Sequence, residues 1–273
     1  MTVMQGDLRK MAVQHHDPVD YYLALDNQQY HLNPLIGQPI SLTSTGEIHC
    51  VQCGRKTSKS FQQGFCFPCM RRINECGNCI IHPERCLVEQ GGCPQDDWAH
   101  AHCDADQMVY LSNTSGLKVG VTRQTQVPTR WIDQGAMQAI PLFFTSNRYQ
   151  AGLIEVALKA FVKDKTNWRT MLKQDSIAMN MTLERDRILQ QASDVLAPIV
   201  MKYPNFIRPI LDNAVDIRFP LGDYPEKVSS LSLEKTPAIE GRLLGIKGQY
   251  LILDIGVLNI RKFSGYRVNV KLG

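Results

Sequence analysis

The residues of this chain that most clearly indicate chemistry are its cysteines, since all nine lie between residues 50 and 103. The first four form two Cys-x2-Cys pairs that are separated by twelve residues. Each pair makes a tight turn that directs two thiolates to one centre, and two pairs complete the tetrahedral sulfur shell that Zn²⁺ accepts. Four thiolates leave no open coordination position, so such a site is structural. The spacing therefore predicts a structural zinc site with the ligands Cys50, Cys53, Cys66 and Cys69.

The other five cysteines continue at wider spacing, with histidines between them. Thiolate and imidazole are both zinc ligands, so a second zinc site is expected. Five thiols compete for four positions, which leaves the ligand set open; the alternative is one spare buried cysteine beside a weak or absent site. A redox pair at positions 76 and 79 is disfavoured, because no βαβ unit surrounds it. The candidates are Cys76, Cys79, Cys86, Cys93 and Cys103, with His82, His100 and His102 among them.

Two short segments follow the cysteine region; the first ends in a tyrosine and the second in a glycine. Met108-Val109-Tyr110, a turn, and Lys118-Val119-Gly120 resemble the two strand motifs of the GIY-YIG nuclease fold. Arg130 and Glu155 fall where that family has its arginine and its metal-binding glutamate. The whole chain is also similar to an uncharacterised bacterial family that joins a zinc-ribbon-like cysteine region to such a domain. The segments GLKVGVTR, PTRWIDQGA and DKTNWR carry that second resemblance.

The nuclease resemblance implies catalytic roles for four residues. Tyr110 would help to activate water, Arg130 would stabilise the phosphate, and Glu155 would hold one Mg²⁺ ion. A single carboxylate suits Mg²⁺, which keeps most of its water ligands. The chain departs from the family where Met108 replaces the glycine of the first motif and Lys118 the tyrosine of the second. A lysine there would act as a point charge beside phosphate, or as a base if burial lowers its pKa.

Each of these residues also has a purely structural interpretation. Tyr110 lies in an apolar segment and would be part of the core. Glu155 and Lys159 stand four residues apart in the order that favours an ion pair on a helix. Arg130 is next to Trp131, and the pair could stack at the surface. The sequence therefore supports both a catalytic and a structural role for this set.

The secondary structure that is predicted around these residues is that of an α+β protein with five consecutive regions. Short β-rich runs separated by Asn, Gly and Pro alternate with segments of helical periodicity. The C-terminal strands are expected to form a barrel-like region, with the N-terminal strands packed into the same barrel. The regions are an N-terminal β region at 1–48, a zinc-ribbon-like module at 49–106, a GIY-YIG-like domain at 107–174, a helical segment at 175–215 and a C-terminal β region at 216–273.

Charge is unevenly distributed along the chain. The formal net charge is +4, but residues 108–172 carry eight Lys and Arg against three acidic residues, a net charge of +5. This is where contact with phosphate is expected. The C-terminal strands also carry basic residues among Tyr250, Phe263 and Tyr266, which could form an oligonucleotide-binding face, although packing is the favoured explanation. These basic residues are Arg242, Lys247, Arg261, Lys262 and Arg267.

Composition limits the class of protein. Hydrophobic residues make up 44% and charged residues 21%, which is typical of a globular chain. No stretch approaches the roughly 20 apolar residues of a membrane helix. The N-terminus has no apolar signal-like segment, so a cytoplasmic location is expected.

Three functions remain open from the sequence. The first is metal-dependent cleavage of nucleic acid by a GIY-YIG-like endonuclease, with structural Zn²⁺ and catalytic Mg²⁺. The second is nucleic-acid binding without cleavage, and the third is a zinc-stabilised scaffold for protein interaction. The sequence does not distinguish DNA from RNA, and it identifies no protein partner.

Overall fold

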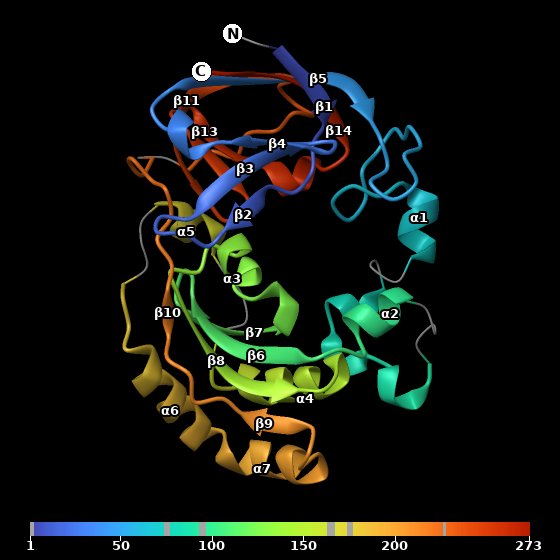
Figure 1. The fold of residues 1–273 in the computed structure, drawn as a ribbon, viewed down its shortest axis with the longest axis vertical. Helices are drawn as coiled ribbons and strands as arrows, with labels where there is room; N and C mark the ends of the chain where they lie inside the picture. Colours follow the sequence, from blue (N-terminus) through green and yellow to red (C-terminus); the bar gives the residue numbers. More distant parts are fainter. Residues whose placement is uncertain (1–2, 74–76, 93–96, 163–166, 174–176, 226–227) are drawn as a thin grey trace.

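The computed structural model describes residues 3–73, 77–92, 97–162, 167–173, 177–225 and 228–273. Figure 1 shows two β-rich layers that are joined on one side by the cysteine-rich segment. The first and last parts of the chain form the upper layer, and the middle of the chain forms the lower one. No helix in the described part of the chain is long and apolar enough to cross a membrane. The mixed α and β content and the antiparallel sheets agree with the predicted class.

The upper layer contains a six-stranded antiparallel sheet that is built from both ends of the chain. β14 alternates buried Val268 and Val270 with more exposed residues, as a strand with one covered face requires. The strand order is β1-β14-β5-β11-β12-β13. No pairing joins β1 to β13 among the described residues, so the barrel-like closure that was expected is not observed there. The strands are β1 (Val3–Asp7), β5 (Pro39–Ile48), β11 (Ala238–Lys247), β12 (Tyr250–Leu253), β13 (Gly256–Asn259) and β14 (Tyr266–Leu272).

The upper layer also contains a small three-stranded sheet and two short 3-10 helices. Leu8, Tyr21 and Leu32 are fully buried in a core that also contains Leu243 and Phe263 of the C-terminal region. The two ends of the chain are therefore held by one hydrophobic core. The elements are β2 (Ala12–Gln14), β3 (Asp20–Leu25), β4 (Gln28–His31), η1 (Asn33–Leu35) and η7 (Ile260–Phe263).

The lower layer is an antiparallel sheet with a different hydrophobic core on each face. Val109 and Leu111 pack with Ile154 of α4 on one face, whereas Tyr110 points to the opposite face and joins the core of the upper layer. Adjacent residues of a strand point to opposite faces, which explains this division. The sheet contains β6 (Gln107–Asn113), β7 (Leu117–Arg123), β8 (Gln138–Thr145), β9 (Ile207–Pro209) and β10 (Val215–Asp216).

Helices cover the lower sheet. Asn147 caps α4 by accepting a hydrogen bond from the Gln150 backbone N–H at 3.0 Å. The segment at 175–215, which was expected to be helical, also contributes β9 and β10, because both pair with β8. The helices of this region are α3 (Thr129–Asp133), α4 (Arg148–Lys159), α6 (Met181–Gln191), α7 (Ser193–Lys202) and the 3-10 helix η6 (Gln124–Gln126). In contrast, α5 (Trp168–Lys173) packs on β12 and β13 of the upper layer.

The cysteine-rich segment contains only short helices, so its shape depends on turns and side-chain contacts. One of these helices, η4, packs against α4, where Gly152 lies against the backbone of Pro83 and Glu84. A Cβ atom on Gly152 would lie 2.2 Å from the Glu84 nitrogen, so only glycine permits this approach. The elements are α1 (Phe67–Arg72), η3 (Asn78–Ile80), η4 (Pro83–Arg85), η5 (Val88–Gln90) and α2 (Asp97–His102).

Candidate zinc centre and basic cavity

The four cysteines of the predicted zinc site converge. The Sγ atoms of Cys50, Cys53, Cys66 and Cys69 all lie within 4.8 Å of one another, and those of Cys53 and Cys66 are 3.9 Å apart. Tetrahedral coordination at about 2.3 Å per Zn–S bond places two sulfurs about 3.8 Å apart. The cluster can therefore hold a metal ion such as zinc. All four ligand positions are cysteine, and the expected geometry of the first site is confirmed.

Local backbone structure directs the four thiols to one point. The chain leaves β5 and turns at Cys50, whose carbonyl accepts a hydrogen bond from the Gly54 N–H at 2.9 Å. Cys66 is the residue that precedes α1, and Cys69 lies one turn further along the same helix face. Gly64 has a φ of +129°, and a Cβ atom there would lie 2.5 Å from the Val51 side chain. The turn before the second pair thus requires glycine.

The thiols are unequal in acidity. Burial opposes ionisation of Cys50, but the backbone N–H groups of Cys66, Cys53 and Gln52 outweigh it and lower the pKa of Cys50 to about 6. The Cys66 N–H donates to the Cys50 sulfur at 3.2 Å. The hydrogen bond with the Cys66 side chain, and then burial, raise the pKa of Cys69 to about 12. Crowded sulfurs cannot all ionise without a cation, which is the condition that bound Zn²⁺ satisfies.

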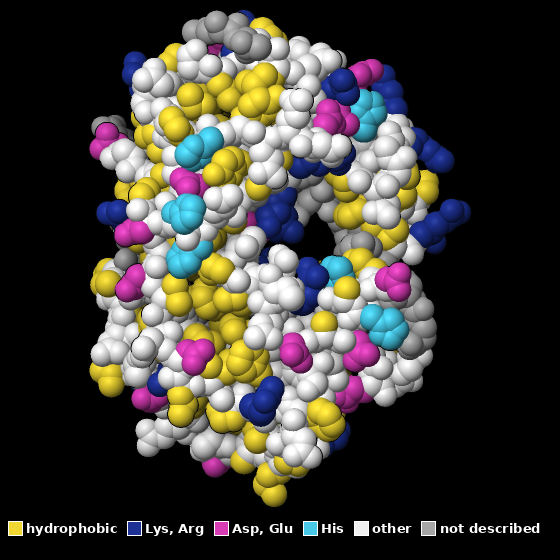
Figure 2. All heavy atoms as spheres, viewed as in Figure 1, with side chains coloured by type: hydrophobic (Ala, Val, Ile, Leu, Met, Phe, Trp, Pro, Cys, Tyr) yellow, Lys and Arg dark blue, Asp and Glu magenta, His cyan; other side chains and the backbone are white. Residues whose placement is uncertain are grey.

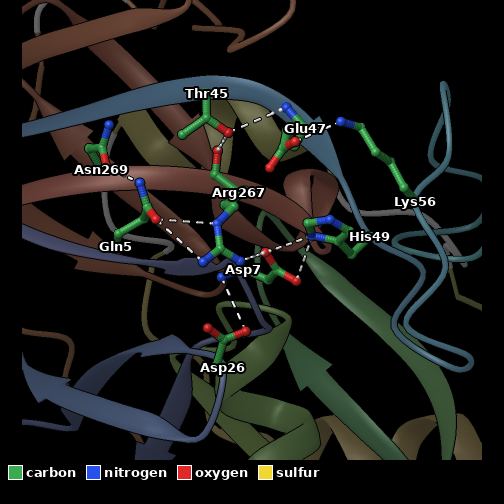
Figure 3. A network of polar contacts seen from close by, with 9 residues as sticks. All are labelled: Gln5, Asp7, Asp26, Thr45, Glu47, His49, Lys56, Arg267 and Asn269. Carbon is green, nitrogen blue, oxygen red and sulfur yellow. Dashed lines mark hydrogen bonds and ion pairs between the residues drawn. The ribbon is translucent and has the colours of Figure 1, made fainter.

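A polar network attaches the zinc cluster to the upper sheet (Figure 3). His49, which directly precedes the first ligand, contacts the Asp7 carboxylate through Nδ1 at 3.0 Å. Arg267 of β14 donates to the same carboxylate at 3.3 Å. Nearby, Lys56 and Glu47 form an exposed ion pair at 2.6 Å. Strands β1, β5 and β14 therefore determine where the cysteine module begins.

Three cysteines of the predicted second site belong to the described residues. Cys86 and Cys103 are buried, and a hydrogen bond with the Cys103 side chain contributes most to lowering the pKa of Cys86 to about 6. The charge of Cys86 also acts on Cys79, whose pKa is raised mainly by burial. Cys76 and Cys93 lie outside the described residues. In the part that is described, no metal-binding group other than the first cluster is found, so the second zinc site stays a prediction.

The histidines of this region have partners of their own. His82 lies 3.4 Å from Glu84, and His100 lies 3.5 Å from Asp104. His102 contacts the Trp98 carbonyl at 2.9 Å through Nδ1 and stacks on the Trp98 ring. His102 therefore stays a candidate ligand of the predicted second site.

Tyr110 is an internal side chain. It is 0% exposed, its hydroxyl donates to the Gln134 side-chain oxygen at 3.0 Å, and its ring packs against Trp131. Burial raises the pKa of Tyr110, and the charge of Arg130 partly offsets this effect. On the neighbouring strand, Lys118 is 8% exposed and pairs in register with Ser112.

Glu155 belongs to a helix on the other face of the sheet. α4 packs on the face that carries Val109 and Leu111, opposite to the face of Tyr110. Glu155 pairs with Lys159 at 3.5 Å, and burial raises the pKa of its carboxyl. Tyr110 is buried, but Arg130 and Glu155 both act on its pKa, so the three residues are electrostatic neighbours. The catalytic assignment of the four residues that the nuclease resemblance selects stays a prediction. Of the four, Arg130 lines the two hollows that are described next.

Sequence reasoning missed a strongly cationic feature of the molecule, which we call the central cavity. It consists of two adjoining hollows of about 870 and 290 Å³ that share Lys10, Ile80, Arg130 and Arg261 in their walls. Figure 2 shows an opening in the middle of the molecule with Lys and Arg side chains on its rim. Six partly buried cationic side chains line the two hollows: Arg9, Lys10, Arg123, Arg130, Arg148 and Arg261.

Negative charge in the walls is insufficient to neutralise these cations. Asp133 is the acidic residue of the lining, and it is paired with Lys10. Burial, and then the charge of Arg148, lower the pKa of Arg123; burial and the charge of Arg130 lower that of Arg261. The guanidinium groups therefore repel one another across the cavity.

Several of these groups are available to a ligand. The side chains of Arg9, Arg123 and Arg261 form no hydrogen bond or ion pair with another described residue. Arg148 instead donates to the carbonyls of Cys79 and Ile80, at 3.3 and 2.6 Å. An anion in the cavity would relieve the mutual repulsion and give the free guanidinium groups acceptors.

Comparison with known proteins gives one match. Residues 37–268 match the family described as protein of unknown function (DUF2797), and the chain belongs to that family. No curated protein and no solved structure matches the chain. The match covers the cysteine cluster and most of the central cavity, but leaves Arg9 and Lys10 outside it.

Proposed function

We propose that this member of the DUF2797 family binds nucleic acid, with its phosphates in the central cavity and with structural zinc holding one wall of that cavity. The observation that carries the proposal is the group of uncompensated guanidinium groups. Arginine is suited to phosphate because its planar fork donates two parallel hydrogen bonds. Clustered cations of this kind are otherwise unfavourable, so a polyanionic ligand is the simplest reason for them.

The zinc cluster would act through the cavity wall. Val51 lies between the first two cysteines, and Phe65 directly precedes the third; both line the larger hollow together with Gln62 and Gln63. A bound ion would hold these wall residues in place, since the segment has little regular structure. Four thiolates leave no coordination position for substrate, so the ion supplies folding energy and no chemistry.

Cleavage is not part of the proposal. Water activation would require a group that reaches the phosphate, and the Tyr110 hydroxyl is buried and hydrogen-bonded to Gln134. A metal at Glu155 would lie on the α4 side of the sheet, away from the face of Tyr110. Binding without turnover is therefore favoured over the GIY-YIG-like endonuclease that the sequence resemblance implies. The scaffold alternative has no specific observation in its favour.

The test is a titration of a fluorescent oligonucleotide, read by anisotropy at several salt concentrations. If the three free guanidinium groups contact phosphate, the logarithm of affinity falls with the logarithm of salt at a slope of about −2 to −3. The double substitution Arg123→Ala and Arg261→Ala should weaken binding at least tenfold and make the slope shallower by about 1 to 2. Incubation with Mg²⁺ should leave the oligonucleotide intact.

The matched control is Arg208→Ala. Arg208 is an exposed arginine on β9, remote in sequence from the cavity residues and absent from its walls. This substitution removes one guanidinium group that lies outside the cavity, and it should leave affinity within twofold of the unsubstituted protein. Equal losses in both variants, or binding that does not respond to salt, would contradict the proposal.

A further inference from the structure

The shape and lining of the central cavity point to one class of nucleic acid. We infer that the cavity receives a single-stranded segment, with phosphates on its guanidinium groups and bases stacked on aromatic side chains of its wall. The inference rests on the proposed function and adds the strandedness of the ligand to it. It is carried by the position of two aromatic rings, by the size of the hollows and by their continuity.

Each hollow combines cations with an aromatic ring. Trp98 lines the smaller hollow beside Arg123 and Arg148. Its ring is partly exposed and stacks on His102, with ring centroids 4.2 Å apart and an angle of 12° between the planes. Phe65 is likewise partly exposed in the larger hollow. Proteins that bind single strands use this combination, because every base has a flat face that stacks on an aromatic ring.

The hollows are too small for a double helix. Their volumes of about 870 and 290 Å³ are those of sites for compact ligands. The bases of a duplex are stacked on one another inside the helix, so a wall ring reaches their faces only after unstacking. A single strand presents base faces and phosphates together at no such cost. The small volumes of the hollows and their aromatic lining therefore favour a single strand over a duplex.

One nucleic-acid strand can pass through both hollows. They share Arg130 and Arg261 in their walls, so a strand that runs from one hollow to the other passes both guanidinium groups. The charge of Arg130 acts on Arg261, which shows that the two groups are electrostatic neighbours. A segment of a few nucleotides would therefore place one base near Trp98 and another near Phe65. A free mononucleotide would use only one of these positions.

The experiment compares four ligands with the full-length protein in one buffer: a 20-nucleotide oligothymidylate, the same-length RNA oligouridylate, a 20-base-pair duplex and free thymidine triphosphate. We expect at least tenfold tighter binding of one single strand than of the duplex. Trp98→Leu and Phe65→Leu should each weaken single-strand binding by five- to hundredfold, the range for the loss of one stacked base. Trp98→Phe keeps a flat ring and should retain most of the affinity.

The matched control is Tyr22→Leu, because Tyr22 also stacks on a histidine, His31, but lies outside the cavity. It should leave affinity unchanged. If Trp98→Leu does not fold, the comparison of Trp98→Phe and Phe65→Leu decides. Thermal denaturation identifies which variants are folded.

The outcomes separate this inference from the proposed function. Duplex binding as tight as single-strand binding, with loss in the arginine variants, overturns the inference and leaves the proposed function standing. Single-strand preference that survives both leucine substitutions also overturns it, because the aromatic walls then contribute nothing. If free thymidine triphosphate binds as tightly as the 20-mer at equal nucleotide concentration, the inference and the proposed function are both overturned. The ligand would then be a small phosphorylated molecule. Absence of binding to every probe overturns both as well.

Discussion

Tyr110 and Gly120 face each other across the β6–β7 ladder, and the phenol occupies the space that a side chain at position 120 would need. A Cβ atom on Gly120 would lie 2.7 Å from the Tyr110 hydroxyl oxygen. The glycine thus permits a large ring to lie flat over the neighbouring strand. These two residues carry much of the resemblance to the nuclease motifs, and their packing gives the pattern a structural explanation.

The first prediction concerns this pair. Gly120→Ala should lower the free energy of unfolding by about 1–3 kcal/mol, because the buried ring must move to admit the methyl group. Tyr110→Phe should cost about 1 kcal/mol, since the hydroxyl loses its hydrogen bond with Gln134. Urea denaturation measures both, and the double variant measures their coupling. A Tyr110→Phe protein with unchanged stability but altered nucleic-acid binding would show that the phenol contacts the ligand.

The second prediction is a pH dependence at Glu155. Burial raises the pKa of this carboxyl, so the folded state holds the proton more tightly than the unfolded state. The carboxyl of Glu155 therefore stabilises the folded state most at low pH. This stabilisation is lost as pH rises from the ordinary glutamate pKa through the raised value. Glu155→Gln should therefore gain stability relative to the unsubstituted protein between pH 4 and pH 7.

Unfolding curves at several pH values test this expectation. Glu184→Gln is a suitable control, because Glu184 forms a comparable helical ion pair with Arg187 at the surface. The control should show no such trend. If Glu155→Gln instead loses stability relative to the unsubstituted protein as pH rises, the assignment is wrong. Selective loss of nucleic-acid binding in this variant would also contradict it.

The third prediction concerns the zinc cluster. Cys50→Ser should remove one equivalent of zinc and lower the melting temperature by about 10 °C or more, because the ion contributes folding energy directly. Metal content and thermal denaturation measure the two effects. Ser60 lies in the same loop, and its buried hydroxyl has no hydrogen-bond partner among the described residues, so Ser60→Ala should keep both zinc and stability. Full zinc content in Cys50→Ser would contradict the site.

The fourth prediction concerns the attachment of the zinc module to the sheet. Asp7→Asn removes the charge that His49 and Arg267 share in a partly buried position, and should cost about 1–3 kcal/mol. Glu47→Gln breaks the nearby exposed pair with Lys56 and should leave stability unchanged within error. Thermal denaturation compares the two. Equal effects would show that the buried network has no special role.

Part of the site was predictable because it is local in sequence. The two Cys-x2-Cys pairs are separated by a short segment, and Gly64 and the start of α1 orient the second pair through neighbouring backbone. Short-range geometry of this kind is encoded by residue type and spacing. The antiparallel hairpin and α4 were predictable for the same reason, since their periodicity appears in a short window.

The sequence by itself determined the cysteine cluster, the mixed α and β class and the excess of basic residues in the middle of the chain. Only the tertiary structure decided which of those residues share a cavity. Arg9, Arg130 and Arg261 come from distant parts of the chain and meet because β1 and β14 pair and the cysteine module returns the chain to the lower sheet. Like charges repel one another, so the sequence contains no complementary pattern from which the proximity of these arginines could be predicted.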